Sequence, residues 1–254
     1  MDALAGHFQT LESKVHFILL GRNQEMLERI SADLRAKSPL ISIVTVITGD
    51  LSQIDEIRRV KQGLGDAFLP VRSYSGYYLF NNAGMLGKLG SVKDIDVVDY
   101  ASTLSVNVLA AQVLTSTFLQ FVQQLPVSER HNRPAFIVST SSLLAIQPLS
   151  CWGVYSSSKA ALDMFHGCLR EELREALEDN VWVLNYAPGP LDTDMMLKDV
   201  LSYSLACTAP FEKMRHDGML IEPRVSAQKL LDYLHGVIAH EKESQPLHVD
   251  FYDI

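Results

Sequence analysis

Tyr155 and Lys159 are four residues apart in the segment YSSSK. On a helix this spacing puts both side chains on one face. A hydride delivered to a carbonyl carbon leaves an alkoxide that a nearby acid must protonate, and a tyrosine can be that acid. Tyrosine titrates near pKa 10, so a donor active near neutrality needs its anion stabilised by ~4 kcal/mol. An ammonium at about 4 Å supplies a similar amount at an effective dielectric of about 20, so Lys159 is predicted to lower the pKa of Tyr155.

Other polar residues stand where they could assist this step. Ser142 lies thirteen residues before Tyr155, after the apolar segment AFIVST, and its hydroxyl could hold a carbonyl oxygen as negative charge develops. Turn or helix capping is the alternative for this serine, and the adjacent Ser141 is the weaker candidate. Asn107 lies in a long helical pattern, where a polar side chain satisfied by its own helix is the plainer explanation.

Apolar segments rich in β-branched and aromatic residues alternate with longer segments of helical spacing. That alternation is typical of a parallel sheet covered by helices, with right-handed crossovers. We therefore expect an α/β fold in a single domain over residues 1–254. The segment 187–224 contains four prolines and is predicted to form a functional lid. The expected strands are 15–20, 41–48, 77–80, 135–140, 181–186 and 247–252, and the expected helices are 23–37, 52–63, 95–125, 153–178 and 225–240.

Four features occur in order along these elements: NNAG (81–84), Asn107, Ser142 and Y-x-x-x-K. Together they resemble the short-chain dehydrogenase/reductase family, from about residue 15 to the C-terminus. The resemblance implies a Rossmann-like, doubly wound parallel sheet with strand order 3-2-1-4-5-6-7 and a nicotinamide cofactor. It also implies a catalytic set of Asn107, Ser142, Tyr155 and Lys159, in which Asn107 positions a water that relays protons to Lys159.

Three further stretches, NYAPGPLDTDM (185–195), VSAQKLL (225–231) and HVDFYD (248–253), resemble a branch of the family that reduces carbonyl groups on pterin side chains. By that resemblance Asp250 is the pterin anchor, since one carboxylate can accept two hydrogen bonds from the 2-amino and N3 groups. An exposed carboxylate at a strand end is the structural alternative. The implied substrate-binding residues are Ser142, Leu143, Tyr155, Gly189 and Asp250.

The residues after strand 15–20 indicate which cofactor is preferred. NAD enzymes place an acid there for the ribose 2′-hydroxyl, whereas this chain has Gly21, Arg22 and Asn23 and no acid before Glu25, which favours NADP. Asp50 could also cap the helix that follows it, and NNAG could be an ordinary turn. The implied cofactor-binding residues are Arg22, Asn23, Asp50, Leu51, Asn82, Ala83, Gly84, Lys159, Leu191, Asp192, Thr193, Asp194, Met195 and Met196.

The family's phosphate-binding loop, T-G-x-x-x-G-x-G between the first strand and the first helix, does not occur in the sequence. The glycines of NNAGMLGKLG follow a later strand and are interpreted as unrelated. Before residue 15, an apolar i, i+4, i+7 pattern that starts at Leu4 predicts a short amphipathic helix. We therefore expect the sheet to lack its central first strand, at ~1–3 kcal/mol for each buried ladder group left unpaired.

Composition narrows the classes of protein. A net charge of −8 without a basic cluster argues against nucleic-acid binding, and the eight histidines show no metal-ligand spacing, so no metal is expected. Cys151, Cys168 and Cys207 are expected to be reduced, buried thiols. No apolar run approaches the ~20 residues of a membrane span, so a soluble cytoplasmic protein is expected. The family resemblance implies a homodimer through the helices 95–125 and 153–178.

Three hypotheses for function follow. The first is NADPH-dependent reduction of pterin side-chain carbonyls, such as those of sepiapterin or 6-pyruvoyl-tetrahydropterin, in tetrahydrobiopterin biosynthesis. The second is a truncated isoform or incomplete gene model that is catalytically weak and acts at most as a dimer partner. The third is a short-chain reductase of another carbonyl compound, because fold and catalytic residues do not specify the substrate.

Overall fold

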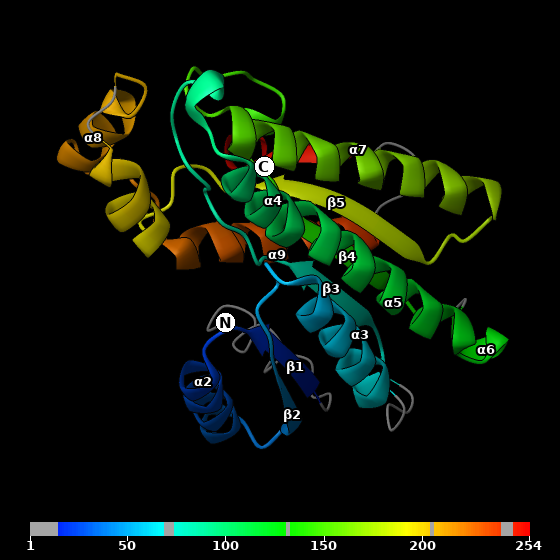
Figure 1. The fold of residues 1–254 in the computed structure, drawn as a ribbon. Helices are drawn as coiled ribbons and strands as arrows, with labels where there is room; N and C mark the ends of the chain where they lie inside the picture. The colour runs from blue at the N-terminus through cyan, green and yellow to red at the C-terminus, as the bar shows by residue number, and fades with distance from the viewer. Residues whose placement is uncertain (1–14, 69–73, 131–132, 204–205, 240–245) are drawn as a thin grey trace.

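The computed structural model describes residues 15–68, 74–130, 133–203, 206–239 and 246–254. The amphipathic helix predicted before residue 15 lies outside these residues. Figure 1 shows parallel strands with helices packed on both sides, which is the α/β architecture predicted from the alternating pattern.

Six strands form where the sequence predicts them. The last is shorter than the predicted 247–252, because the Asp250 carboxylate accepts the Tyr252 N–H at 2.9 Å and the chain turns into a 3₁₀ segment, Phe251–Asp253. The side chains therefore stop alternating between the two faces of the sheet at Asp250. The strands are β1 (Val15–Gly21), β2 (Ile41–Thr48), β3 (Tyr77–Asn81), β4 (Ala135–Thr140), β5 (Val181–Ala187) and β6 (His248–Asp250).

The strands form two separate parallel sheets, one of order β1-β2 and one of order β3-β4-β5-β6. This is the family order with its first strand left out, as the sequence predicts. Among the described strands, β1 pairs only with β2, and β3 pairs only with β4. The family's second and fourth strands, which are β1 and β3 here, are therefore not paired with each other. As a result only one residue of β1, Leu19, is fully buried, although VHFILLG has the apolar sequence of a central strand.

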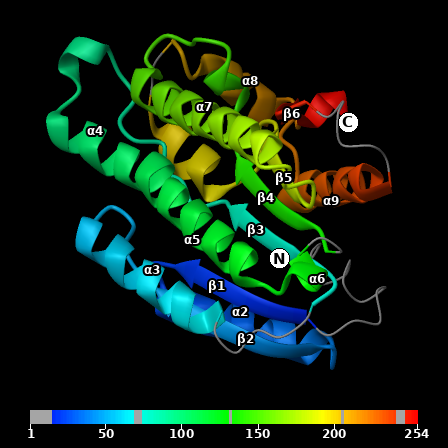
Figure 2. The ribbon, with the colours of Figure 1, turned by 90° about the vertical axis from the view of Figure 1, so that its right-hand side faces the viewer.

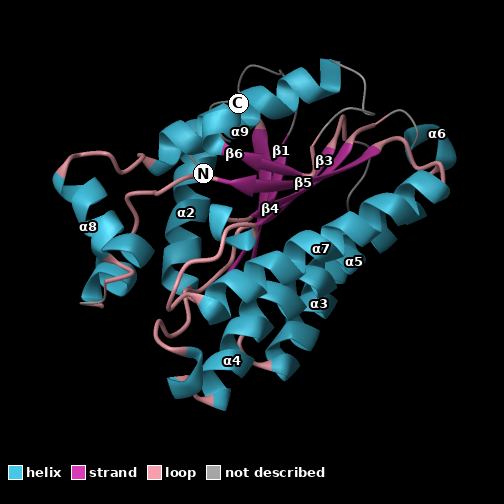
Figure 3. Cartoon of the chain, turned by 90° about the horizontal axis from the view of Figure 1, so that it is seen from above, coloured by secondary structure: helices cyan, strands magenta, loops and turns pink. Residues whose placement is uncertain are grey.

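Helices cover the larger sheet on both faces (Figures 2 and 3). On one face α9 packs against β4 and β5 through Leu230 and Leu234. On the other face lie α5 and α7, and α3 packs between α5 and the smaller sheet. The helices are α2 (Gln24–Lys37), α3 (Ile54–Phe68), α4 (Val97–Leu104), α5 (Ala111–Gln124), α6 (Val127–Arg130), α7 (Gly153–Glu175), α8 (Ala209–His216) and α9 (Pro223–Ala239).

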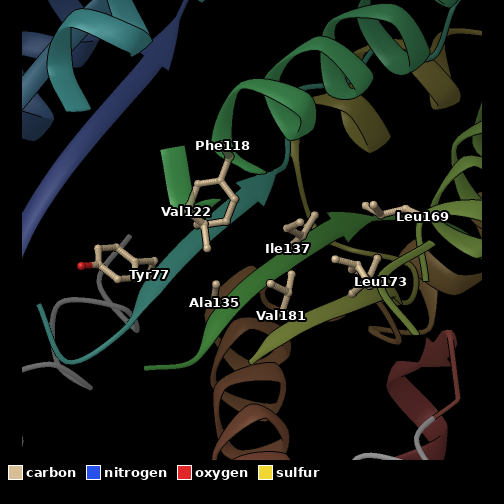
Figure 4. Packing of buried hydrophobic residues seen from close by; sticks show 9 residues of the cluster. Tyr77, Phe118, Val122, Ala135, Ile137, Leu169, Leu173 and Val181 are labelled. Carbon is tan, nitrogen blue, oxygen red and sulfur yellow. The ribbon is translucent and has the colours of Figure 1, made fainter. Parts of the chain in front are cut away.

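The main hydrophobic core lies between the larger sheet and the helices α5 and α7 (Figure 4). Ala135 and Ile137 of β4 are completely buried at its centre. Phe118 and Val122 of α5 cover them from one side, and Leu169 of α7 covers them from the other. This packing fixes where α7 begins relative to the end of β4.

The predicted helix 95–125 is one helical segment with a wide turn, because α4 and α5 are joined by the π-helical turn Ser105–Ala110. The whole segment, Val97–Gln124, has 28 residues and is apolar enough to cross a membrane, contrary to the sequence expectation. Over half of its most apolar stretch is buried inside the fold, as in the core helix of a globular domain.

The predicted lid, 187–224, contains α8 and a π-helical turn, Met195–Asp199. Its two ends are tied together by an isolated bridge between Leu191 and Ile221. The cysteine prediction is partly wrong, since the thiols are free but only Cys207 is buried, and Cys168 on the outer side of α7 is exposed.

Candidate active site

The candidate catalytic residues meet where α7 begins beside the end of β4. Tyr155 lies in the first turn of α7 and Lys159 lies one turn later. The Lys159 Nζ donates to the carbonyl oxygen of Thr140, the last residue of β4, at 2.7 Å, and it lies 5.6 Å from the centre of the Tyr155 ring. The side chains of Tyr155 and Ser142 are hydrogen-bonded to each other. The structure thus brings together three of the four predicted catalytic residues.

The electrostatics of this pair differ from the sequence prediction. Burial raises the pKa of Tyr155, and the hydrogen bond with Ser142 opposes this only in part. Burial also lowers the pKa of Lys159 to about 8, against the attraction of Asp163. The predicted lowering of the Tyr155 pKa by Lys159 is therefore wrong, because the phenolate loses its hydration and the ammonium bonds to Thr140. Tyr155 is a protonated phenol at neutral pH, the form that can donate a proton.

Asn107 comes from the π-helical turn and is only 1% exposed. Its Oδ1 accepts the Met85 N–H at 2.8 Å, while its Nδ2 donates to the Met85 carbonyl at 2.8 Å and to the Ser158 Oγ at 2.9 Å. The side chain is therefore satisfied by two other segments and not by its own helix. It fixes the chain after NNAG to α7, next to the candidate catalytic residue Lys159, and π-helical turns are frequent at functional sites.

The two adjacent serines at the end of β4 have different partners. Ser142 contacts Tyr155, and its Oγ also accepts the Leu144 N–H at 3.2 Å, so the capping alternative and the catalytic contact coexist. The Ser141 hydroxyl donates to Asp163 Oδ1 at 2.7 Å. Leu143, predicted to contact substrate, is 41% exposed beside them.

The residues predicted for the adenosine end lie where β1 and β2 end. The Gly49 N–H donates to the Gly21 carbonyl at 3.0 Å, which holds these two strand ends together. Arg22 is exposed next to this junction. The pKa of Asp50 is lowered, first by hydrogen bonds from Ser52 and also by the positive charge of Arg22. Arg22 and Asp50 therefore lie close enough to act at one site.

Three of these residues also have structural roles. Asn23 caps α2, accepting the Met26 N–H at 2.9 Å, so its side chain contributes to helix stability. The side chain of Leu51 is buried in the core between α3 and α5. Asp50 Oδ1 accepts the Ser52 N–H at 3.0 Å, which closes a local turn before α3; because that helix begins at Ile54, Asp50 does not cap it as the alternative predicted.

The NNAG segment leaves β3 towards α7. Asn82 Oδ1 accepts the Thr140 hydroxyl at 2.9 Å, and Ala83 is exposed. A Cβ atom on Gly84 would lie 3.5 Å from both Asn107 Oδ1 and Lys159 Nζ, so this glycine lies between the two. The later Gly87 has a φ of 71° and packs on α4, which is a structural role.

The lid segment leaves β5 through Gly189, whose φ of 76° suits glycine, and a Cβ there would collide with Ile221. The Asp192 N–H donates to the Ile221 carbonyl at 2.9 Å. Thr193 Oγ1 accepts the Met196 N–H at 3.4 Å. Of the other predicted cofactor residues here, Met196 is buried, Leu191 and Met195 are half-buried, and Asp194 pairs with Lys198 at 2.9 Å.

Two residues that the sequence did not indicate lie next to the site, Asp163 on α7 and His248 on β6. Asp163 accepts hydrogen bonds from Ser141 and from His248 Nδ1, each at 2.7 Å. His248 lies on β6 two residues before Asp250, so both side chains are on one face of the strand. The available signal was spacing, because Asp163 is four residues after Lys159 and faces the same side of α7.

Residues 4–202 match the short chain dehydrogenase family. The chain belongs to this family and is an oxidoreductase with the family's Rossmann-like α/β fold. Sepiapterin reductase of Bos taurus is 33% identical over 240 residues, covering 93% of this chain and 84% of that protein. The Mus musculus enzyme is 32% identical, covering 99% of this chain and 92% of that one. A short-chain dehydrogenase/reductase structure from Saccharomyces cerevisiae has a TM-score of 0.72 at 20% identity, over 99% of this chain and 91% of the other, which shows the fold.

Members of this family use a nicotinamide dinucleotide, and the described residues fit its two ends. Arg22, which is exposed, and Asp50, which is half-buried, stand at adjoining strand ends, where the adenosine would lie. At the nicotinamide end, Lys159 uses one N–H on Thr140 and has two further donors for ribose hydroxyls. For the pyrophosphate the fit is poorer, since the described residues contain no glycine-rich turn between the two sheets.

Proposed function

We propose that this chain reduces carbonyl groups on pterin side chains with NADPH, in the route to tetrahydrobiopterin. The observation that carries the proposal is the convergence of Ser142, Tyr155 and Lys159 at the end of β4, with the Asp250 carboxylate at the end of β6 in the same sheet. The likeness to sepiapterin reductases over nearly the whole chain supports it.

Each residue has a role that follows from its surroundings. The Ser142 hydroxyl holds the carbonyl oxygen, and Tyr155, half-buried and protonated, donates a proton to that oxygen. The Lys159 ammonium, held on the Thr140 carbonyl, keeps two further donors for the ribose hydroxyls of the cofactor. NADPH, when bound, supplies the hydride. Asp250 accepts hydrogen bonds from the pterin's amino group and N3, and so orients the side chain towards Tyr155.

The decisive experiment is Tyr155→Phe, which removes the proton donor and keeps the ring. With sepiapterin and NADPH we expect kcat to fall by about 10²–10⁴-fold. Tyr252→Phe is the matched control, since Tyr252 is 67% exposed outside the catalytic set, and it should keep the original rate. Unchanged turnover by the Tyr155 variant would refute the proposal.

Substrate class is tested at Asp250. Asp250→Ala should raise KM for sepiapterin by about tenfold or more, because a charge-assisted hydrogen bond contributes ~1.5–3 kcal/mol. The KM for benzil, a diketone without a pterin ring, should stay the same. Asp253→Ala is the control at a neighbouring exposed acid. Equal losses on both substrates would favour a reductase of another carbonyl compound.

Cofactor choice is tested at Arg22. Arg22→Ala should raise KM for NADPH by about tenfold and leave KM for NADH unchanged, since only NADPH carries the 2′-phosphate. Arg29→Ala, at an exposed arginine on α2, is the control. A variant that loses affinity for both cofactors alike would count against a role in phosphate recognition.

A second candidate, a catalytically weak chain that acts as a dimer partner, is favoured by the split between the two sheets and by the poorer fit to the pyrophosphate. It predicts little change in NADPH fluorescence when the purified chain is titrated into the cofactor. Micromolar or tighter binding of NADPH by this chain would exclude it.

We further propose a soluble cytoplasmic homodimer joined through α4, α5 and α7. Three exposed apolar side chains on these helices support this interface: Val97 is 74% exposed, Val98 is 69% and Met164 is 69%. Sedimentation should give twice the chain mass, and Val98→Glu with Met164→Glu should give the monomer. A wild-type monomer, or a membrane-bound fraction after cell lysis, would overturn the corresponding part.

A further inference from the structure

A buried carboxylate lies behind the candidate active site and takes no part in the roles assigned above. The side chain of Asp163, on α7, is 13% exposed. Its two oxygens are divided between two other elements: Oδ1 accepts from Ser141 after β4, and Oδ2 accepts from His248 on β6, both at 2.7 Å. One carboxylate therefore ties α7 to both strands whose ends carry the candidate catalytic and substrate residues.

The first consequence concerns Lys159. Asp163 follows it by one helical turn and faces the same side of α7. The Lys159 ammonium is buried, and its attraction to Asp163 raises its pKa against that burial. The other titratable or polar groups around Asp163 are His166 on the same helix, Ser141 after β4 and His248 on β6. Asp163 is thus an acidic neighbour whose charge opposes the effect of burial on this lysine.

The second consequence concerns β6. That strand has only three residues, and its register with β5 begins with the pair His248 and Asn185. The hydrogen bond from His248 to Asp163 fixes the start of β6 on α7. Asp250 ends the same strand and projects on the same face as His248. The position of the Asp250 carboxylate relative to Tyr155 therefore depends on the hydrogen bond between His248 and Asp163.

We propose that Asp163 is a positioning residue that couples the two halves of the site, keeping Lys159 protonated for the proton step and holding Asp250 in place for the pterin. This role rests on the proposed function for its substrate half. Its electrostatic half concerns only Lys159, and can be measured without turnover.

The electrostatic half is tested by following Lys159 in protein labelled with ε-¹⁵N lysine. The wild type should titrate near the pKa of about 8, and Asp163→Asn should titrate about one pH unit lower. In a pH–rate profile the basic limb should move by the same amount, about a tenfold loss of kcat above the limb. Glu172→Gln, at an exposed acid on α7, should change neither. An unmoved Lys159 titration in a folded Asp163→Asn variant would overturn this half.

The substrate half is tested by His248→Gln, which cuts the tie to β6 and leaves the Asp163 charge. We expect KM for sepiapterin to rise several-fold, while the basic limb of the pH–rate profile stays in place. Equal loss of kcat on sepiapterin and benzil, or a shifted limb, would overturn it. If Asp163→Asn fails to fold, Asp163→Ser decides the electrostatic half, since it also removes the charge and should lower the Lys159 titration in the same direction.

These outcomes separate the two proposals. A chain that turns over no carbonyl substrate but shows the shifted Lys159 titration keeps the role of Asp163 towards Lys159 and loses the proposed function. A chain that reduces sepiapterin with an unchanged titration and an unchanged KM in these variants keeps the proposed function and loses the role of Asp163.

Discussion

The two sheets of this protein are built from equally apolar strands, yet they are stabilised to different degrees. In the larger sheet, the first five residues of β4 are buried, with helices on both faces. In the smaller sheet β1 has one buried residue of seven. Part-buried polar contacts between elements, such as Asn107 to Met85 and Ser141 to Asp163, lie in the part that holds the candidate catalytic residues. A parallel strand needs neighbours on both edges and cover on both faces to exclude water, and β1 has one described neighbour.

The largest expected difference between the sheets lies in their cores. Ile137→Ala in β4 should cost ~2–5 kcal/mol in free energy of unfolding, because Ile137 is completely buried and leaves a cavity. Ile18→Ala in β1 should cost ~1–2 kcal/mol, since Ile18 is only partly buried. Urea unfolding of both variants measures this, and equal losses would show that β1 is as well packed as β4.

A histidine beside each sheet sharpens the comparison through pH: His16 lies on β1, and His166 lies on α7 against β5. Burial lowers the pKa of His166, which bonds Asn185 at 2.6 Å, and of His16, which bonds Thr45 at 3.0 Å. Both histidine pKa values are lower in the folded protein than in the unfolded chain, where histidine has a pKa of about 6.5. Below that pH the unfolded chain therefore binds more protons than the folded protein. The free energy of unfolding should therefore have its full value above about pH 6.5 and decrease as the pH drops below it.

His166→Gln should flatten this pH dependence more than His16→Gln, because His166 is fully buried and His16 is not. The free energy of unfolding is measured with urea from pH 5 to pH 8, which is about 1.5 units on either side of the ordinary histidine pKa. A larger effect from His16 would mean that the smaller sheet is the better shielded of the two.

The smallest expected effects test whether the two sheets unfold together. Leu177, just after α7, has a φ of 55° and is 75% exposed, so Leu177→Gly should add ~1 kcal/mol by relieving a left-handed conformation. Gly65→Ala within α3 should add a similar ~1 kcal/mol, since a Cβ there meets no atom within 4 Å. In one cooperative transition both raise the same Tm by ~2–4 °C. Two transitions, each raised by only one variant, would show that the sheets unfold separately.

The elements could be predicted because hydrophobic period and flanking residues are local. Strands 41–48 and 135–140 match to the residue, whereas β6 ends early because Asp250 forms its own turn. The missing neighbour of β1 followed from the absent glycine motif, but the separation into two sheets depends on packing between distant segments. Leu191 and Ile221 illustrate the same limit, since no local pattern indicates their bridge.

The candidate site was predictable in its residues and not in its electrostatics. Ser142, Tyr155 and Lys159 lie together as their order along the chain indicates. The pKa of Tyr155 moves the opposite way, because burial is a property of the folded environment that spacing does not contain. Asp163 was missed because its partners, Ser141 and His248, come from other strands.

The wide turn at Ser105–Ala110 has a consequence for how this chain tolerates changes in length. Each residue of an α-helix advances the helix by about 100°, and a π-helical turn accommodates one extra residue. Removing one residue from 105–110 would close this turn into a regular α-helix, with the faces of α4 and α5 kept nearly in register. The widened backbone that carries the Asn107 side chain to Met85 would then be lost, although the buried face of α5 stays in place. A deletion here should therefore be more harmful than most substitutions, because this part of the site depends on the number of residues as well as on their identity.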